Sequence, residues 1–204
     1  MSRAEAKERN RRALLDAAGE LVARDGYRAR LDEIAERAGL TTGAVYSLFG
    51  SKSGLVTALV ADRLGPYYAE IARAVPEGAD LLGAVDALAR HHRRGWEAPG
   101  ARAVVGLQIT LLDMALRDDA LGERLAVAVR EQDTHLAELL TGRRHGKGTV
   151  PAERARRLAL ALRALFVGFG QGIVLGLAPG ADEEHVAAAA RALAEGLTTE
   201  PATP

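Results

Sequence analysis

The sequence contains no cysteine, and this absence excludes two kinds of structure. A chain without thiols forms no disulfide and holds no thiolate-bound metal. A lack of cysteine also suits the reducing cytoplasm, which is the location we expect. Aromatic residues are scarce as well, at 4%, whereas alanine is abundant. Because alanine favours helix and sheets draw on aromatic and β-branched clusters, the composition predicts an all-α protein.

The sequence also lacks an excess of charge of either sign. It has 27 basic and 27 acidic residues, so its net charge gives no support for nucleic-acid binding. The distribution is less even, because residues 1–12 hold five basic and two acidic side chains. Two interpretations of this basic segment stay open: an arm that reaches phosphates, or a solvated terminus.

Long hydrophobic runs are missing too. Residues 1–5 do not have the apolar stretch of a signal peptide. Residues 158–178 carry Arg163 as their only charge, but their uncharged part, 164–178, is shorter than the roughly 20 residues that span a bilayer. We interpret this segment as a helix buried on every side within a soluble protein, and we expect no membrane partner.

Hydrophobic periodicity predicts about nine helices and no pair of strands. The expected helices cover about 6–25, 31–38, 42–49, 52–74, 81–99, 102–116, 120–141, 152–178 and 183–197. The glycine-rich segment 142–148 is expected to be a polar loop. We expect a domain over 1–50, a connecting helix over 51–74, a second helical domain over 75–198 and a disordered tail over 199–204.

The most informative segment is 31–52, LDEIAERAGLTTGAVYSLFGSK. A short helix ends at Gly39, which permits a left-handed turn, and a second helix begins three residues later, capped by Thr41. This pattern is typical of a helix-turn-helix, with Val45 and Phe49 facing inward. The outer face of the second helix carries small or hydrogen-bonding residues that suit a major groove: Thr42, Gly43, Ala44, Tyr46 and Ser47. An ordinary helical hairpin uses the same glycine turn and remains an alternative.

Residues 12–59 resemble the DNA-binding domain of the TetR family of bacterial transcriptional regulators. The resemblance rests on the segments LLDAAGELVARDGY, EIAERAGL and TTGAVYSLFGSKSGL. It also rests on the spacing from Ile34 and Gly39 through Tyr46 to Lys52 and Leu55. The resemblance implies a fold with an N-terminal three-helix DNA-binding domain and a C-terminal helical domain for ligand binding and dimerisation.

The resemblance also implies roles for single residues. Thr42 and Tyr46 would contact phosphates and base edges, and Lys52 would pair with a phosphate at a helix start. Arg30 departs from the family, which usually has Thr or Ser there, so a helix cap is lost and a cation near a phosphate is gained. The implied DNA-binding residues are Arg30, Thr41, Thr42, Gly43, Ala44, Tyr46, Ser47 and Lys52.

The rest of the chain would then hold a small effector. Polar groups on otherwise apolar helix faces are typical of a pocket, and the apolar character of the lining predicts a hydrophobic or amphipathic molecule. The candidate lining residues are His92, Trp96, Gln108, Gln132, Phe166 and Phe169. The alternative for each polar member is a core group with a satisfied hydrogen bond.

The last two helices have more apolar face than one chain usually covers, so we expect a homodimer built as a four-helix bundle. The expected interface residues are Gly168, Gly172, Gly176, Val186, Ala189, Ala190, Leu193 and Leu197. The alternative is that both helices pack wholly within one chain.

The resemblance implies a repressor that leaves double-stranded operator DNA when its effector binds, and activation remains an alternative. We expect no enzyme, because the sequence has no Glu-x-x-His pair, phosphate-binding glycine loop or nucleophile elbow. We expect no cofactor and no metal, because His91, His92, His135 and Asp113 are dispersed. A helical-bundle enzyme and a protein-interaction module without DNA binding remain the alternatives, and salt-dependent, sequence-selective DNA binding separates them from a regulator.

Overall fold

A computed structural model shows how the chain folds. It describes the backbone of residues 2–198 and, within that range, every side chain except those of residues 27, 63–69 and 197–198. The tail over 199–204, for which the sequence predicts disorder, lies outside the described residues.

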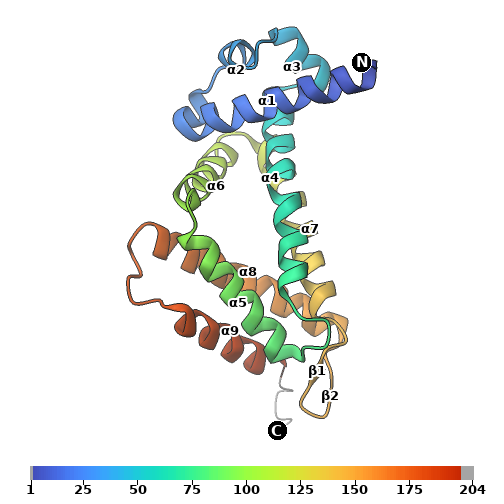
Figure 1. Ribbon diagram of the computed structural model, residues 1–204, viewed down its shortest axis with the longest axis vertical. Helices are drawn as coiled ribbons and strands as arrows, with labels where there is room; N and C mark the ends of the chain where they lie inside the picture. Colours follow the sequence, from blue (N-terminus) through green and yellow to red (C-terminus); the bar gives the residue numbers. More distant parts are fainter. Residues whose placement is uncertain (1, 199–204) are drawn as a thin grey trace. The chain divides into compact units, whose positions relative to one another are not determined.

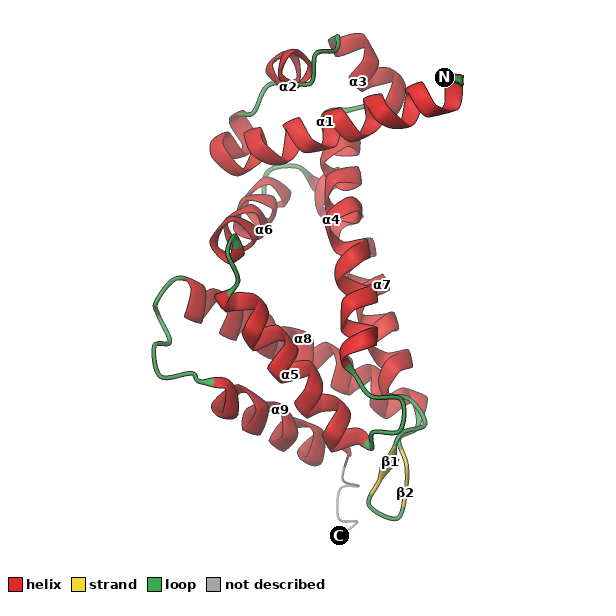
Figure 2. Cartoon of the chain, viewed as in Figure 1, coloured by secondary structure: helices red, strands yellow, loops and turns green. Residues whose placement is uncertain are grey.

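The described chain is all-α, as predicted, with nine α-helices and one short 3-10 helix within residues 2–198 (Figures 1 and 2). The elements are α1 (Arg3–Asp25), η1 (Gly26–Arg28), α2 (Leu31–Arg37), α3 (Thr42–Phe49), α4 (Lys52–Ala74), α5 (Leu81–Glu97), α6 (Ala101–Ala115), α7 (Asp119–Leu140), α8 (Ala152–Val174) and α9 (Glu183–Thr198).

The expectation of no strand pair is wrong. Two short strands, β1 (Arg144–His145) and β2 (Gly148–Thr149), pair antiparallel inside the segment expected to be a loop. The two residues between them form the turn, and Gly146 has a positive φ of 57°, which two-residue hairpin turns require. The hairpin is the only sheet among the described residues and is the one yellow element in Figure 2.

Two helix ends differ from the sequence-based bounds for local reasons. Helix α1 begins at Arg3 because Ser2 and Glu5 form a capping box, with the Glu5 amide 3.1 Å from the Ser2 hydroxyl. Helix α8 ends at Val174, four residues early, because Gly176 adopts a φ of 74°. The amides of Leu177 and Ala178 then turn back onto the Gly172 carbonyl, at 2.6 and 2.9 Å.

The chain divides into two compact units. Unit 1 comprises residues 1–66 and 106–128, and unit 2 comprises residues 67–105 and 129–204. The sequence-based division differs from this one, because it placed all of 75–198 in one domain. Each unit has its own core of buried aliphatic side chains: α1 to α3 pack around Leu14, Ile34 and Val45 in unit 1, and α5, α8 and α9 pack around Leu88, Leu162 and Val186 in unit 2.

Helix α8 is not buried on every side, contrary to the expectation from its composition. By length and composition it is the one described helix that qualifies as a candidate membrane span, a test that core helices also pass. Only 28% of its most apolar stretch is buried within the chain. Leu160 is 52% exposed, and Ala164 and Gly168 are exposed on the same side. One face of α8 therefore has no covering among the described side chains of unit 2.

Candidate functional site

The turn between α2 and α3 has the geometry that the sequence predicts. Gly39 has a φ of 68°, and the Leu40 amide donates a 2.8 Å hydrogen bond to the Ala35 carbonyl, which closes the end of α2. Ile34 and Ala35 of α2 and Val45 of α3 are almost completely buried. The two helices are thereby fixed against each other and against α1 within unit 1 (Figure 1).

Helix α3 turns one face to the solvent. Its N-cap is Thr41, whose hydroxyl accepts a 3.3 Å hydrogen bond from the Ala44 amide, as predicted. Val45 is fully buried, whereas Tyr46, the next residue, is 55% exposed. Thr41, Gly43 and Ser47 are also exposed, and Thr42 and Ala44 are half-buried. The residues expected to meet DNA therefore line an accessible helix face, and their contact with DNA stays a prediction.

The start of α4 is held rigidly beside this face. The Ser51 hydroxyl accepts a 2.9 Å hydrogen bond from the Gly54 amide, which confirms the expected cap. A Cβ on Gly54 would lie 2.0 Å from the Phe49 carbonyl oxygen, so the close approach of α3 and α4 requires glycine here. Ser53 donates a 2.6 Å hydrogen bond to Asp118 at the start of α7, and this bond lowers the pKa of that carboxyl.

The surroundings of Lys52 and Arg30 bear differently on their predicted phosphate contacts. Partial burial disfavours the charged form of Lys52 and so lowers its pKa, and a nearby phosphate would stabilise the charge again. Arg30 makes no side-chain cap for α2, as expected. Its guanidinium instead holds Asp32 at 2.5 and 3.1 Å, and this hydrogen bonding lowers the pKa of Asp32. Arg30 would have to leave or share Asp32 to contact a phosphate.

Three of the six candidate pocket residues come together in unit 2. The His92 ring stacks on Trp96 at a centroid distance of 5.9 Å and lies 4.2 Å from the Phe166 ring. Burial, with a smaller contribution from the neighbouring His91, lowers the pKa of His92 to about 3. The cluster is tight, since a Cβ on Gly170 would lie 2.8 Å from the Trp96 indole nitrogen.

The other three candidates do not join this cluster in the described structure. Phe169 meets His185 of α9 edge-on, at 5.8 Å. Gln132 is half-buried on α7 in unit 2, whereas Gln108 belongs to unit 1. The full lining proposed from the sequence stays a prediction.

An open groove of about 590 Å³ lies elsewhere in unit 2, between the end of α4 and α5. Its walls are charged, and none of the six candidates lines it. The lining residues are Glu70, Arg73, Ala74, Gly83, Asp86, Ala87, Arg90, His91 and Arg94. Within the described side chains, no group of three or more His, Asp or Glu residues is placed to hold a metal ion.

The expected dimer residues divide into two sets. Val186 and Ala190 are fully buried against α5 and α8 within the same chain, so they are core residues and not interface residues. Gly172 packs against Ala178, where a Cβ would lie 3.1 Å away, and Gly176 terminates α8. The assignments of Val186 and Ala190 are corrected, whereas those of Gly172, which is half-buried, and Gly176, which is exposed, stay predictions.

The remaining dimer candidates stay open to a partner. Gly168 is exposed with no neighbour within 4 Å of an added Cβ, and Ala189 and Leu193 are half-buried. The side chain of Leu197 lies outside the described residues. The sequence-based interface did not include Leu160 and Ala164, although Leu160, Ala164 and Gly168 follow one another at intervals of four residues and so share a helix face.

Comparison with known proteins finds a family model that matches part of the chain. Residues 14–59, which include the helix-turn-helix, match the model of the bacterial regulatory proteins of the tetR family. No curated protein is similar to the chain in sequence at a significant level.

Solved structures match more than nine-tenths of the chain. GusR of Salmonella enterica is 18% identical with a TM-score of 0.69, over 93% of this chain and 95% of that one. A transcriptional regulator from Rhodococcus sp. Rha1 is 19% identical with a TM-score of 0.64, over 92% and 95% of the two chains. FadR of Bacillus subtilis, solved in complex with stearoyl-CoA, is 17% identical with a TM-score of 0.63, over 93% and 98%. The helix-turn-helix segment thus matches the tetR family model, and the chain has the all-helical fold of the solved structures to which it is similar.

Proposed function

We propose that the protein is a cytoplasmic transcriptional repressor that binds double-stranded operator DNA through α3 and leaves it when a small effector binds. The observation that carries the proposal is the two-sided character of α3. Val45 is fully buried behind the helix, while the next residue, Tyr46, is 55% exposed in front of it. A short helix anchored from behind, with small and hydrogen-bonding residues in front, fits a major groove.

A homodimer would supply the second recognition helix. Helix-turn-helix dimers read two half-sites about 34–36 Å apart, one turn of DNA. The uncovered face of α8, with Leu160, Ala164 and Gly168 in one line, offers the apolar surface that an isologous contact requires. The exposed alanines of α9, Ala188 and Ala192, have side chains small enough for a close helix approach and would extend this surface.

The effector would act on unit 2. Similarity to FadR with bound stearoyl-CoA supports an amphipathic molecule as the first compound to test. Helix α4 is a direct covalent path for the signal, because its first part belongs to unit 1 and its last part to unit 2. An effector that binds more tightly to the conformation unable to bind DNA lowers the affinity for DNA. The size of the decrease is set by the difference between the effector's affinities for the two conformations.

The test is a binding titration with the DNA upstream of the protein's own gene. We expect salt-dependent binding that is selective over a random duplex of equal length, and weaker binding when stearoyl-CoA or a free long-chain fatty acid is added. Equal affinity for both duplexes would contradict the DNA-reading role. If binding is selective but no amphipathic compound weakens it, the proposed class of effector is wrong, whereas the DNA-reading role stands.

A further inference from the structure

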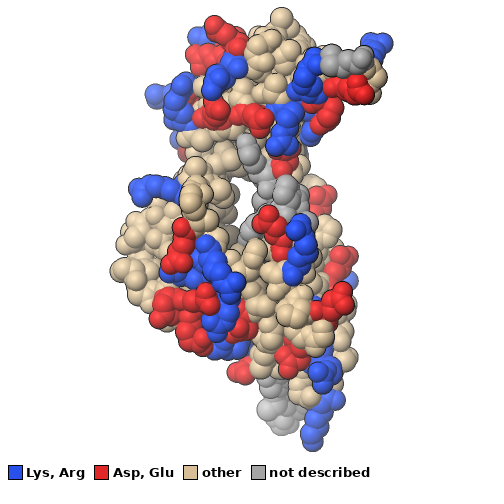
Figure 3. All heavy atoms as spheres, in the orientation of Figure 1, with Lys and Arg blue, Asp and Glu red and all other residues tan. Residues whose placement is uncertain are grey.

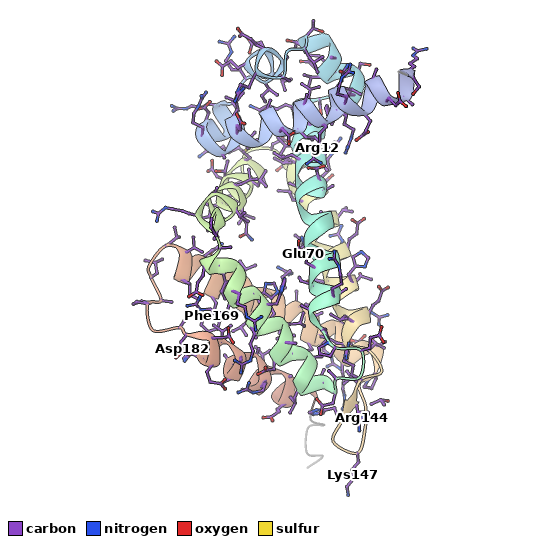
Figure 4. The ribbon with its side chains drawn as sticks, viewed as in Figure 1. Arg12, Glu70, Arg144, Lys147, Phe169 and Asp182 are labelled. Atoms are coloured by element: carbon purple, nitrogen blue, oxygen red, sulfur yellow. The ribbon has the colours of Figure 1, made fainter. Side chains whose placement is uncertain are left out.

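The β1–β2 hairpin carries a concentrated basic patch that the proposed function does not use. Residues 142–149, GRRHGKGT, contain three arginine or lysine residues and one histidine, and no acidic residue. The chain as a whole has balanced charge, so this accumulation is local. In Figure 3, basic atoms project at the hairpin, and Figure 4 labels Arg144 and Lys147 there.

Hydrogen bonds at its base fix the hairpin to the rest of unit 2. Arg143 donates hydrogen bonds to the carbonyls of Leu139, Ala79 and Pro76, at 2.6, 2.8 and 3.3 Å. The Gly142 amide and the Val150 carbonyl are 2.9 Å apart, and Val150 is 3% exposed. Arg143 therefore serves the fold, and the strands beyond it are held at both ends.

Arg144 and Lys147 have no such structural task. Both are exposed, and neither side chain makes an ion pair or hydrogen bond within the described part of the chain. Other arginines of unit 2 are committed to carboxylates, among them Arg90, Arg163 and Arg191. The two hairpin cations help to line a hollow of about 360 Å³ together with Thr149 and Asp80.

We infer that this hairpin is a second, sequence-independent contact with the phosphate backbone of duplex DNA. A two-stranded ribbon is narrow enough to enter a groove of DNA. Arg144 lies opposite Thr149 in the register, which puts the two side chains on the same face of the hairpin. The glycines at 142, 146 and 148 let the backbone come close to a phosphate. A lipid surface fits less well, because the segment 142–149 has no aromatic or aliphatic side chain to insert.

The test uses the full-length chain and a random-sequence 30-base-pair duplex, with Tyr46→Ala as the background so that base reading by α3 does not contribute. Affinity is measured by fluorescence anisotropy over a range of salt concentrations. The hairpin variant is R144A/K147A. The control is R102A/R130A, which removes the same charge from exposed, unpaired arginines of unit 2 outside the hairpin.

We expect the hairpin variant to weaken binding and to reduce the slope of log K against log salt by about 0.9 for each phosphate that the hairpin cations neutralise. The control should keep the slope of the background protein. Equal slopes for the hairpin variant and the background would overturn the inference, as would an equal weakening of binding in variant and control. Binding of the hairpin to phosphatidylglycerol vesicles that the duplex does not displace would also overturn it. Because Tyr46 is already removed, none of these outcomes depends on operator recognition.

Discussion

At the scale of single residues, Gly170 shows how tightly the aromatic cluster of unit 2 is packed. A Cβ at this position would lie 2.8 Å from the Trp96 indole nitrogen and 3.1 Å from Cε2, and both atoms belong to a rigid ring. Gly170→Ala therefore has to displace the indole, although alanine favours helix over glycine by about 1 kcal/mol.

We expect Gly170→Ala to lower the free energy of unfolding by about 1–2 kcal/mol, since overpacking typically costs more than the helix propensity returns. Trp96 is the only tryptophan in the chain, so its fluorescence should change as well. The control is Gly106→Ala in α6, an exposed position outside the proposed dimer interface where an added Cβ meets no neighbour within 4 Å, and this substitution should stabilise the protein. Identical stabilisation by both substitutions would show that the Trp96 ring moves aside at no cost, which would contradict the prediction.

His92 gives the cluster a pH dependence. Burial against Trp96 and Phe166, with His91 nearby, lowers the pKa of His92 to about 3, so the folded protein keeps the ring neutral. The unfolded chain binds a proton near pH 6.5. The unfolded state therefore holds more protons between these values, and stability is complete above pH 6.5 and falls as the pH drops toward 3.

The expected slope in this window is at most about 1.4 kcal/mol per pH unit. It should be visible between pH 6.5 and 5, above the range in which the carboxyls of Asp86 and Glu183 titrate, because their pKa values are lowered by arginine hydrogen bonds. Denaturant titrations of wild type and His92→Phe test this. A wild-type curve that runs parallel to that of His92→Phe would mean that the imidazole is accessible to protons in the folded state.

At the scale of secondary-structure elements, α5 and α9 are joined by a network of ion pairs. Asp86 of α5 accepts hydrogen bonds from Arg90 and from Arg191 of α9, and Arg90 reaches Glu183 and Glu184 at 2.8 and 2.7 Å. The side chains of Asp86, Arg90 and Arg191 are only about 30% exposed, so solvent screens them less than a surface pair.

Asp86→Asn should therefore destabilise the protein by about 1–2 kcal/mol, because two guanidinium groups lose a shared carboxylate. The loss should shrink in 1 M salt. Asp113→Asn is the control, since Asp113 forms the same i,i+4 pair with Arg117 but is 52% exposed. It should cost less than about 0.5 kcal/mol. Equal effects of both substitutions would show that the network adds nothing to an ordinary surface pair.

The elements also show what a sequence can and cannot predict. Caps and glycine turns depend on a few adjacent residues, so Thr41, Ser51 and Gly39 were predicted correctly, and with them the helix-turn-helix. The early end of α8 depends on Gly176 taking a positive φ, a conformation that glycine permits but does not require. The hairpin was missed for another reason: its strands have two residues each, which is too short to show an alternating hydrophobic pattern.

Burial was harder to predict than helix position. Periodicity marks the apolar face of α9, but it does not say whether α5 and α8 or a second chain covers that face. Val186 and Ala190 were thus assigned to an interface and lie in the core. The same limit applies to the expected pocket, where Phe166 joins His92 while Phe169, three residues along α8, meets α9.

At the scale of the whole molecule, the uncovered face of α8 is the ground for proposing a homodimer. Gly168→Arg tests it directly, since the exposed position has room for a long side chain in a single chain but not in a packed pair. We expect a dimer for the wild type and a monomer for this variant in sedimentation at micromolar concentration. Gly95→Arg, at an equally open glycine of α5, should remain dimeric. A wild-type monomer, or a dimer that tolerates Gly168→Arg, would remove α8 from the interface.

Operator recognition depends on α3 reading DNA with the face that carries Tyr46. The most direct test compares wild type, Tyr46→Ala and Leu177→Ala for affinity to the upstream duplex and to a random duplex; Leu177 is 76% exposed and lies outside α3. We predict that Tyr46→Ala weakens operator binding by about 10- to 100-fold and reduces the selectivity over random DNA, while Leu177→Ala changes neither. Unchanged operator affinity in Tyr46→Ala would contradict the assignment of α3 as the recognition helix.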